Sequence, residues 1–205
     1  MSLPKHILFG ANDHGGAHAI APALLACREK GSVLLGVATW PARSIFAGYG
    51  LECTDGEIMD NQALCASADA FTPELFLAGT SGGNSIDKKI LEHVRGRVRS
   101  VYILDFWNNY WQRFSEHERD FKYLPDLICV MDQSAKTEMI AEGFSPEHIA
   151  VTGNPYFSHF ADAIDTAKED AHQILFISQP IADTMKRPGF ENIGFDEFDV
   201  LRGLQ

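Results

Sequence analysis

The sequence predicts an α/β protein with a Rossmann-like fold, a three-layer α/β/α sandwich around a mostly parallel sheet. One observation is that short β-prone runs alternate with helical stretches along most of the 205 residues. Another is that several of these runs are apolar at nearly every position, which is typical of strands covered by helices on both faces. The short connections between the two kinds of segment favour parallel strands joined by helical crossovers.

Each expected strand is an apolar run rich in β-prone residues. The strands are expected at residues 6–11, 32–39, 74–80, 100–106, 127–132, 149–153 and 173–179. The segment 42–58 is harder to interpret, because its apolar residues are interrupted by glycines and acidic residues. We expect a short helix there and a weak or irregular strand at LECT, residues 51–54.

Helices are expected between these strands. They are expected at residues 17–31, 60–70, 84–97, 134–143 and 154–170. The first carries apolar residues at helical spacing and ends on Gly31, a residue type that stops helices. Asn84 and Ser134 stand where N-caps are expected, and Gly143 stands where a helix ends.

The C-terminal part indicates a second structural unit. The strand expected at 173–179 follows an acidic helical stretch and precedes one short helix in FDEFDVLRGL, residues 195–204. This order resembles the start of another domain. We therefore expect a Rossmann-like domain at 1–170 and the opening of a truncated second domain at 171–205. The alternative is a tail that packs on the first domain.

Composition limits the classes of function. A formal charge of −11 and a pI of about 5.1 argue against nucleic acid as the main partner, and they weaken the case for anionic lipid. No apolar run approaches the roughly 18–20 residues of a membrane helix, and Asp13 interrupts the N-terminus too early for a signal peptide. The scattered cysteines are typical of free thiols in a reducing compartment. We expect a cytoplasmic protein without a bound metal or cofactor.

The loop NDHGGAH, residues 12–18, follows the first expected strand, and ligands of doubly wound sheets bind beyond strand carboxyl ends. Gly15 and Gly16 can adopt a positive φ and allow close backbone approach, and amides at a helix N-terminus attract anions. His14 and His18 could donate to a phosphate or a sugar hydroxyl. The spacing is not GxGxxG, so no dinucleotide site is indicated. A tight turn with incidental histidines is the alternative.

A second polar loop, GTSGGNS, joins the strand at 74–80 to the next helix. Ser81, Gly82, Gly83 and Asn84 could offer hydroxyl, amide and N–H groups to an oxyanion or a sugar. The spacing and the lysine of a P-loop are missing, and a helix cap with a flexible turn is the alternative. The basic residues that follow are interpreted as a solvated helix face. They are Lys88, Lys89, Arg95, Arg97 and Arg99.

A third loop, LDFWNNYWQRF, follows the strand at 100–106. Asp105 ends that strand, and Trp107 and Asn108 come directly after it. Aromatic faces beside amides suit carbohydrate, because a sugar stacks its apolar face and hydrogen-bonds through its hydroxyls. Asp105 is a candidate general base. Rings that only close the edge of the core are the alternative.

Residues 126–157 carry a more specific pattern, in which a strand, a helix, a second strand and VTGNP follow one another. The pattern resembles the N-terminal domains of GT-B glycosyltransferases and of UDP-N-acetylglucosamine epimerases. The matching residues are Asp126, Ile128, Val130, Asp132, Gly143, Ile149, Val151, Thr152, Gly153, Asn154 and Pro155. The glycine-rich loop with His18 is placed as in those domains, and WNNYWQRF is similar to polysaccharide-biosynthesis members. Asn154 and Pro155 alone are also explained as a cap and a helix start.

The resemblance implies a glycosyltransferase-like protein of surface-polysaccharide synthesis that binds a sugar or phosphosugar acceptor. In those families the C-terminal domain carries most nucleotide-sugar contacts, so a donor-binding domain or subunit is expected from elsewhere. Two alternatives to this interpretation stay open. One is a non-catalytic binding module that needs such a partner. The other is an epimerase or hydrolase that acts on a nucleotide sugar. A homo-oligomer is also left open.

We expect the loops at 12–18, 80–84 and 105–111 to share one cleft, because parallel strands deliver them to the same edge of the sheet. Asp105 would act as the base, and His14 would bind the ligand or shuttle a proton. The other residues expected to bind the ligand are Gly15, Gly16, His18, Ser81, Gly82, Gly83, Asn84, Trp107, Asn108 and Asn154.

Overall fold

The computed structural model describes residues 3–161, 176–186 and 194–203. The chain divides into two units, Met1–Asp165 and Thr166–Gln205. The domain boundary expected between residues 170 and 171 lies outside the described residues. Within the described residues, no helix has both the length and the apolar composition needed to cross a bilayer.

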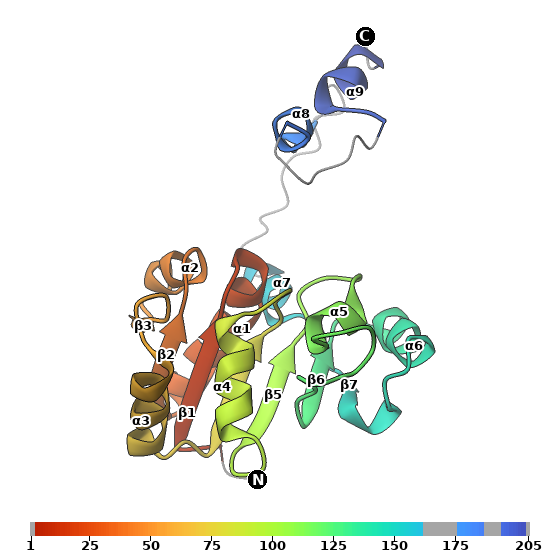
Figure 1. Ribbon diagram of the computed structural model, residues 1–205. Helices are drawn as coiled ribbons and strands as arrows, with labels where there is room; N and C mark the ends of the chain where they lie inside the picture. The colour runs from red at the N-terminus through yellow and green to blue at the C-terminus, as the bar shows by residue number, and fades with distance from the viewer. Residues whose placement is uncertain (1–2, 162–175, 187–193, 204–205) are drawn as a thin grey trace. The chain divides into compact units, whose positions relative to one another are not determined.

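The first unit is built on a seven-stranded sheet in which every paired strand is parallel, in the order β3-β2-β1-β4-β5-β6-β7 (Figure 1). Its strands are β1 (His6–Ala11), β2 (Val33–Ala38), β3 (Cys53–Asp55), β4 (Leu75–Gly79), β5 (Arg99–Ile103), β6 (Leu127–Val130) and β7 (Ile149–Val151). The α/β, Rossmann-like expectation is confirmed. The weak strand expected at 51–54 is β3, and it begins two residues later.

Each strand of the first unit is followed by a helix. These helices are α1 (His14–Glu29), α2 (Ala42–Gly48), α3 (Asn61–Phe71), α4 (Ile86–Val94), α5 (Tyr110–Phe114), α6 (Gln133–Ala141) and α7 (Pro155–Ala161), with a 3-10 turn, η1 (Pro146–His148). The second unit contains α8 (Ile181–Thr184) and α9 (Glu197–Gly203). The helix expected at 195–204 is therefore confirmed as α9. Of the strand expected at 173–179, residues 173–175 lie outside the described residues, and residues 176–179 form no strand.

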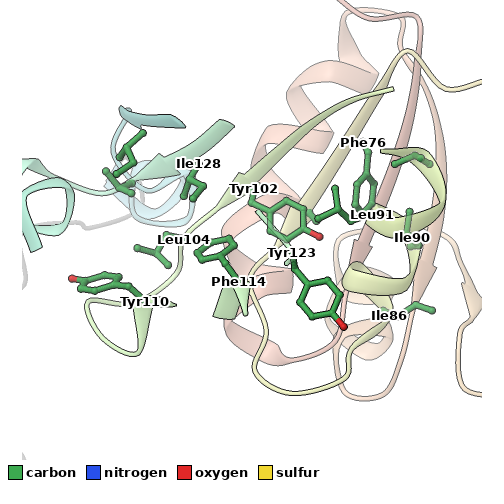
Figure 2. Packing of buried hydrophobic residues seen from close by; sticks show 14 of the residues in the cluster. Phe76, Ile86, Ile90, Leu91, Tyr102, Leu104, Tyr110, Phe114, Tyr123 and Ile128 are labelled. Atoms are coloured by element: carbon green, nitrogen blue, oxygen red, sulfur yellow. The ribbon is translucent and has the colours of Figure 1, made fainter. Parts of the chain in front are cut away.

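Both faces of the sheet are apolar and covered, which explains why the strands lack alternation. In β1, Ile7 and Phe9 pack with the buried side chains of α1 and α2, whereas Leu8 packs with those of α3, α4 and α6. The buried cluster that contains Leu8 also contains a row of aromatic rings in contact with one another (Figure 2). Tyr102 lies between Phe76, at 5.9 Å, and Phe114, at 6.0 Å between ring centroids. This packing fixes α4 and α5 against the central strands.

Several helix starts differ from expectation. The first helix begins at His14, so both glycines of the expected loop lie in its first turn, and neither has a positive φ. The caps expected at Asn84 and Ser134 are wrong. Ser85 caps α4, and Asp132 caps α6 through Oδ1, which accepts from the amide of Ala135 at 2.8 Å. The carboxylate of Asp132, directly before the first helical residue, reaches that amide, whereas Ser134 already lies inside the helix.

The two glycines that were expected to end helices do so. Gly31 and Gly143 have φ of 94° and 107°, the left-handed region expected after a helix. The helix expected at 154–170 begins at Pro155 and is described as far as Ala161. Asn154 is its cap, as expected, because its Oδ1 accepts from the amide of Tyr156 at 3.0 Å.

Candidate functional site

The candidate site lies where the strand order changes direction. β1 pairs with β2 on one side and with β4 on the other. The helix after β1 covers one face of the sheet, and the helix after β4 covers the opposite face. The connections that leave these two strands therefore diverge and open a crevice at their carboxyl ends, the usual ligand position in such sheets.

A pocket of about 400 Å³ occupies this crevice. It is lined by Asp13, His14, Gly15, Gly82, Asp105, Asn109, Gln112 and Arg113. These residues come from the segments that follow β1, β4 and β5. The three loops expected to converge therefore do so, and His14, Gly15, Gly82 and Asp105 are the expected site residues that line the pocket.

An ion pair forms the polar centre of the pocket. Arg113 donates to Oδ1 of Asp105 at 2.7 Å and to Oγ1 of Thr80 at 2.8 Å. The Thr80 hydroxyl in turn donates to the same Asp105 oxygen at 2.9 Å. The Arg113 and Asp105 side chains are only 12% and 16% exposed, so water screens the pair weakly. The arrangement fixes one oxygen of Asp105 and leaves the second for other contacts.

Gly15 accommodates that second oxygen. A Cβ at position 15 would collide with Oδ2 of Asp105. Gly16 serves a different contact, because a Cβ there would lie 3.2 Å from the Cα of Gly79 at the end of β4. The two adjacent glycines thus allow the first turn of α1 to approach β4 and Asp105 more closely than any other residue would permit.

Asp13 is a pocket residue that was not among the expected site residues. Its Oδ1 accepts from the amide of Gly16 at 2.9 Å and caps α1. Burial raises the pKa of Asp13, and the nearby Asp105 carboxylate raises it further. The Gly16 amide, Arg113 and the Ser81 hydroxyl oppose that rise. Its place directly before a helix was the sequence signal that could have identified it.

Arg113, Asn109 and Gln112 were also missed. They belong to α5 and its cap, a five-residue helix too short to show a periodic pattern. Asn109 has a left-handed backbone, with φ of 55°. The spacing of three and four residues places Gln112 and Arg113 on the same side as Asn109, and this spacing is the signal that the sequence offered.

The other expected residues do not line the pocket. Ser81 is buried beneath it, and Gly83 and Asn84 are exposed. Trp107 donates to Oδ2 of Asp132 at 2.8 Å and stacks against Phe157. Of the others, Gly16 packs on β4, Asn108 is exposed, and Asn154 caps α7.

His18 also lies outside the pocket lining, half-buried on α1. Its Nδ1 is 3.3 Å from the Tyr49 hydroxyl, and its ring packs on Tyr156. Burial, and then the neighbouring His14, lower the pKa of His18. A neutral imidazole between two aromatic rings is better explained by packing than by contact with a ligand in the pocket.

The expectation that Lys88 belongs to a solvated basic face is wrong. Its side chain is buried, and its ammonium donates to the carbonyl of Gly83 at 2.7 Å and lies over the ring of Tyr123. Burial lowers the pKa of Lys88, while Asp87 and Asp120 oppose that effect. The long apolar stem of a lysine allows such burial when the charged end finds an acceptor.

Known structures share this fold, although no protein family and no curated protein matches the sequence. The MnaA structure from S. aureus with UDP is 17% identical, with a TM-score of 0.57 over 82% of this chain and 50% of that one. A UDP-GlcNAc 2-epimerase from Neisseria meningitidis bound to UDP-GlcNAc is 16% identical, with a TM-score of 0.57 over 78% and 49%. MurG from Acinetobacter baumannii is 12% identical, with a TM-score of 0.51 over 84% and 48%.

These comparisons establish the fold. The chain has the Rossmann-like α/β architecture of GT-B proteins, as the resemblance in the sequence implied. It spans about half the length of the solved structures that it matches.

Proposed function

We propose that the pocket binds a sugar or phosphosugar as the acceptor half of a GT-B-type glycosyltransferase site of surface-polysaccharide synthesis. The observation that carries this proposal is the Asp105–Arg113 pair, held by the Thr80 hydroxyl, in the lining of a pocket at the strand carboxyl ends. A sugar offers hydroxyls that both donate and accept. The pocket offers carboxylate oxygens as acceptors and a guanidinium and an exposed imidazole as donors.

The residues would take different roles in this site. Oδ2 of Asp105 would accept a hydrogen bond from an acceptor hydroxyl, while Arg113, which already neutralises Asp105, would donate its remaining N–H groups to a sugar or phosphate oxygen. Because Arg113 neutralises Asp105, His14 would act as the base in its place: it is exposed, lines the pocket and would take the proton that the hydroxyl loses during transfer. The amides of the Gly82 loop would hold further oxygens.

A second candidate is a reaction on the nucleotide sugar itself. It is favoured because several of the matching structures are UDP-GlcNAc 2-epimerases, one bound to UDP-GlcNAc. Two carboxyl groups, Asp13 and Asp105, also line the pocket, and a pair of carboxyls with different environments suits proton removal and return. This candidate requires turnover of UDP-GlcNAc without an added acceptor.

Under either proposal a second lobe would complete the site, since the match covers only about half of each matching structure. Exposed aromatic side chains around the carboxyl ends of the strands support this view. Trp40, Phe106 and Phe157 are 66%, 52% and 53% exposed, and large exposed aromatic groups commonly mark contact surfaces. We infer that a donor-binding domain or subunit covers this edge.

Calorimetry on the purified chain tests the proposal. The ligands are N-acetylglucosamine, its 1-phosphate, UDP and UDP-GlcNAc. Binding of the sugar or its 1-phosphate with 1:1 stoichiometry is the expected result for an acceptor site, and binding of UDP-GlcNAc with formation of its 2-epimer favours the second candidate. If none of the four binds at about 1 mM, a limit that corresponds to roughly −4 kcal/mol, the pocket is not a sugar site.

A further inference from the structure

One wall of the pocket is a loop with little packing of its own. Gly82, Gly83 and Asn84 are exposed, and a Cβ at either glycine would have no heavy atom within 4 Å. Gly83 also has a positive φ of 65°. A segment with so few contacts of its own depends for its conformation on the residues that attach it to the rest of the fold.

The attachment points are Ser81, directly after Thr80 at the end of β4, and residues at the start of α4. The ammonium group of Lys88 donates a hydrogen bond to the carbonyl of Gly83 in the middle of the loop. Ser81 and Ser85 stand at its two ends, and both are buried. Asp87 is completely buried, and both serine hydroxyls lie close enough to its carboxyl group to favour the charged form.

Asp87 is an unusual residue to find in such a place. Neither of its carboxylate oxygens, and neither serine hydroxyl, has a partner at good hydrogen-bond geometry among the described residues. A buried carboxylate without full hydrogen bonding strongly destabilises the folded state in an apolar setting. The nearby helix N-terminus offsets only part of that effect, so a role beyond stability is the more economical explanation.

We propose that Asp87 is a positioning residue, and that its charged carboxylate holds the Ser81 and Ser85 hydroxyls and thereby shapes the Gly82–Asn84 wall of the pocket. The hydroxyls would turn toward the carboxylate when it is charged and would lose that acceptor when it is neutral. Ligand affinity in the pocket would then depend on a residue that no ligand touches. Only this last step rests on the proposed function.

The groups around Asp87 set the pH range in which its carboxylate is charged and holds the loop. Burial raises the pKa of Asp87 to about 6, and the Ser85 hydroxyl, Lys88 and the Ser81 hydroxyl oppose the rise. Tyr102, on β5, donates its hydroxyl to the backbone carbonyl of Asp87 at 3.0 Å and not to its carboxyl group. The Ser81 hydroxyl also lowers the pKa of Asp13, the titratable residue that precedes α1. The loop should therefore loosen as the pH falls through about 6.

Amide hydrogen exchange of residues 80–86 tests the proposal without any ligand. Asp87→Asn keeps the size of the side chain and removes its charge. At pH 7 we expect roughly tenfold faster exchange in this segment, while the melting temperature stays the same or rises because a buried charge has been removed. A purely structural role would lower the melting temperature together with loop protection, so the opposite movement of the two readouts is diagnostic.

Three further measurements complete the test. The Ser81→Ala, Ser85→Ala double variant should reproduce the faster exchange, and Asp60→Asn, which changes an exposed N-cap acid of α3, should not. The parent protein, corrected for the intrinsic pH dependence of exchange, should approach the Asp87→Asn rate near pH 5. Unchanged exchange in Asp87→Asn overturns the proposal. If the loop loosens but the parent binds no sugar, the positioning role stands and the proposed function fails.

Discussion

Gly15, in the first turn of α1, lies directly against Oδ2 of Asp105 at the end of β5. The two residues are 90 positions apart in the chain, and their contact joins the first and third loops of the pocket. The other oxygen of Asp105 is held by Arg113 and Thr80. The position of the Asp105 carboxylate is therefore set by an ion pair on one side and by the absence of a side chain on the other.

Gly15→Ala should weaken ligand binding without unfolding the protein. The added methyl group would displace Asp105 from Arg113 and Thr80, whereas alanine in a helix gains up to about 1 kcal/mol over glycine. We expect sugar affinity to fall by roughly tenfold or more, about 1.4 kcal/mol, in calorimetry. Gly48→Ala is the matched control, because a Cβ there meets no atom within 4 Å. Equal loss in both variants would contradict the role given to Gly15.

Gly79→Ala should instead destabilise the fold. A Cβ at position 79 would collide with the backbone of Gly16, and backbone cannot move aside as a side chain can. Overpacking of this kind costs about 1–3 kcal/mol, so the urea midpoint should fall while Gly48→Ala leaves it nearly unchanged. A Gly79→Ala protein as stable as its parent would mean that α1 and β4 do not approach as closely as described.

The architecture was predictable because it depends on patterns that span many residues. Strands such as β1 and β4 are apolar on both faces, and this property alone indicates helices on both sides of a parallel sheet. Parallel strands then bring their following loops to one edge. For that reason Gly15, Gly82 and Asp105 could be placed together from sequence.

The details of the pocket were less predictable because they depend on single contacts. Arg113 lies in a helix too short to recognise, and its role follows only from the ion pair with Asp105. Lys88 appeared to be a surface residue because lysine usually is, but the carbonyl of Gly83 gives its charge a buried partner. Trp107 was expected to stack against a sugar, but its indole N–H donates a hydrogen bond to Asp132.

The Asp105–Arg113 pair should be coupled in both stability and binding. Arg113→Met leaves a partly buried carboxylate without its cation, and Asp105→Asn leaves the guanidinium without its anion. Each change should cost about 1.5–3 kcal/mol in urea denaturation, the range for hydrogen bonds to charged groups. The double variant should lose less stability than the sum of the two single variants, because each single change leaves a partly buried charge without its partner.

Arg97→Met provides the control for this cycle. Arg97 also pairs with an aspartate, Asp69, but both side chains are more than half exposed, and such pairs contribute about 0–1 kcal/mol. Additive losses at positions 105 and 113 would show that the two side chains act independently. Sugar binding should disappear in either single variant and persist in Arg97→Met.

The pH dependence of stability should carry the signature of Asp87. Burial raises the pKa of Asp87 from its ordinary value of 3.8 to about 6, so between these values the folded state holds a proton that the unfolded state has lost. Stability then decreases as the pH rises through this window, and the loss is complete above about pH 6. His18 acts in the opposite direction, because its pKa is lowered from the ordinary value of 6.5 and stability therefore rises with pH in the range just below that value.

Comparison of two proteins separates these effects. Urea denaturation of the parent and of Asp87→Asn, each from pH 4 to pH 7, gives a difference from which the contribution of His18 cancels. We expect the variant to gain stability relative to the parent as the pH rises from 4 to 6 and to keep a constant advantage above that, since only the parent must bury the charge of Asp87. A difference that does not change with pH would mean that Asp87 keeps the same protonation state in the folded and unfolded chains.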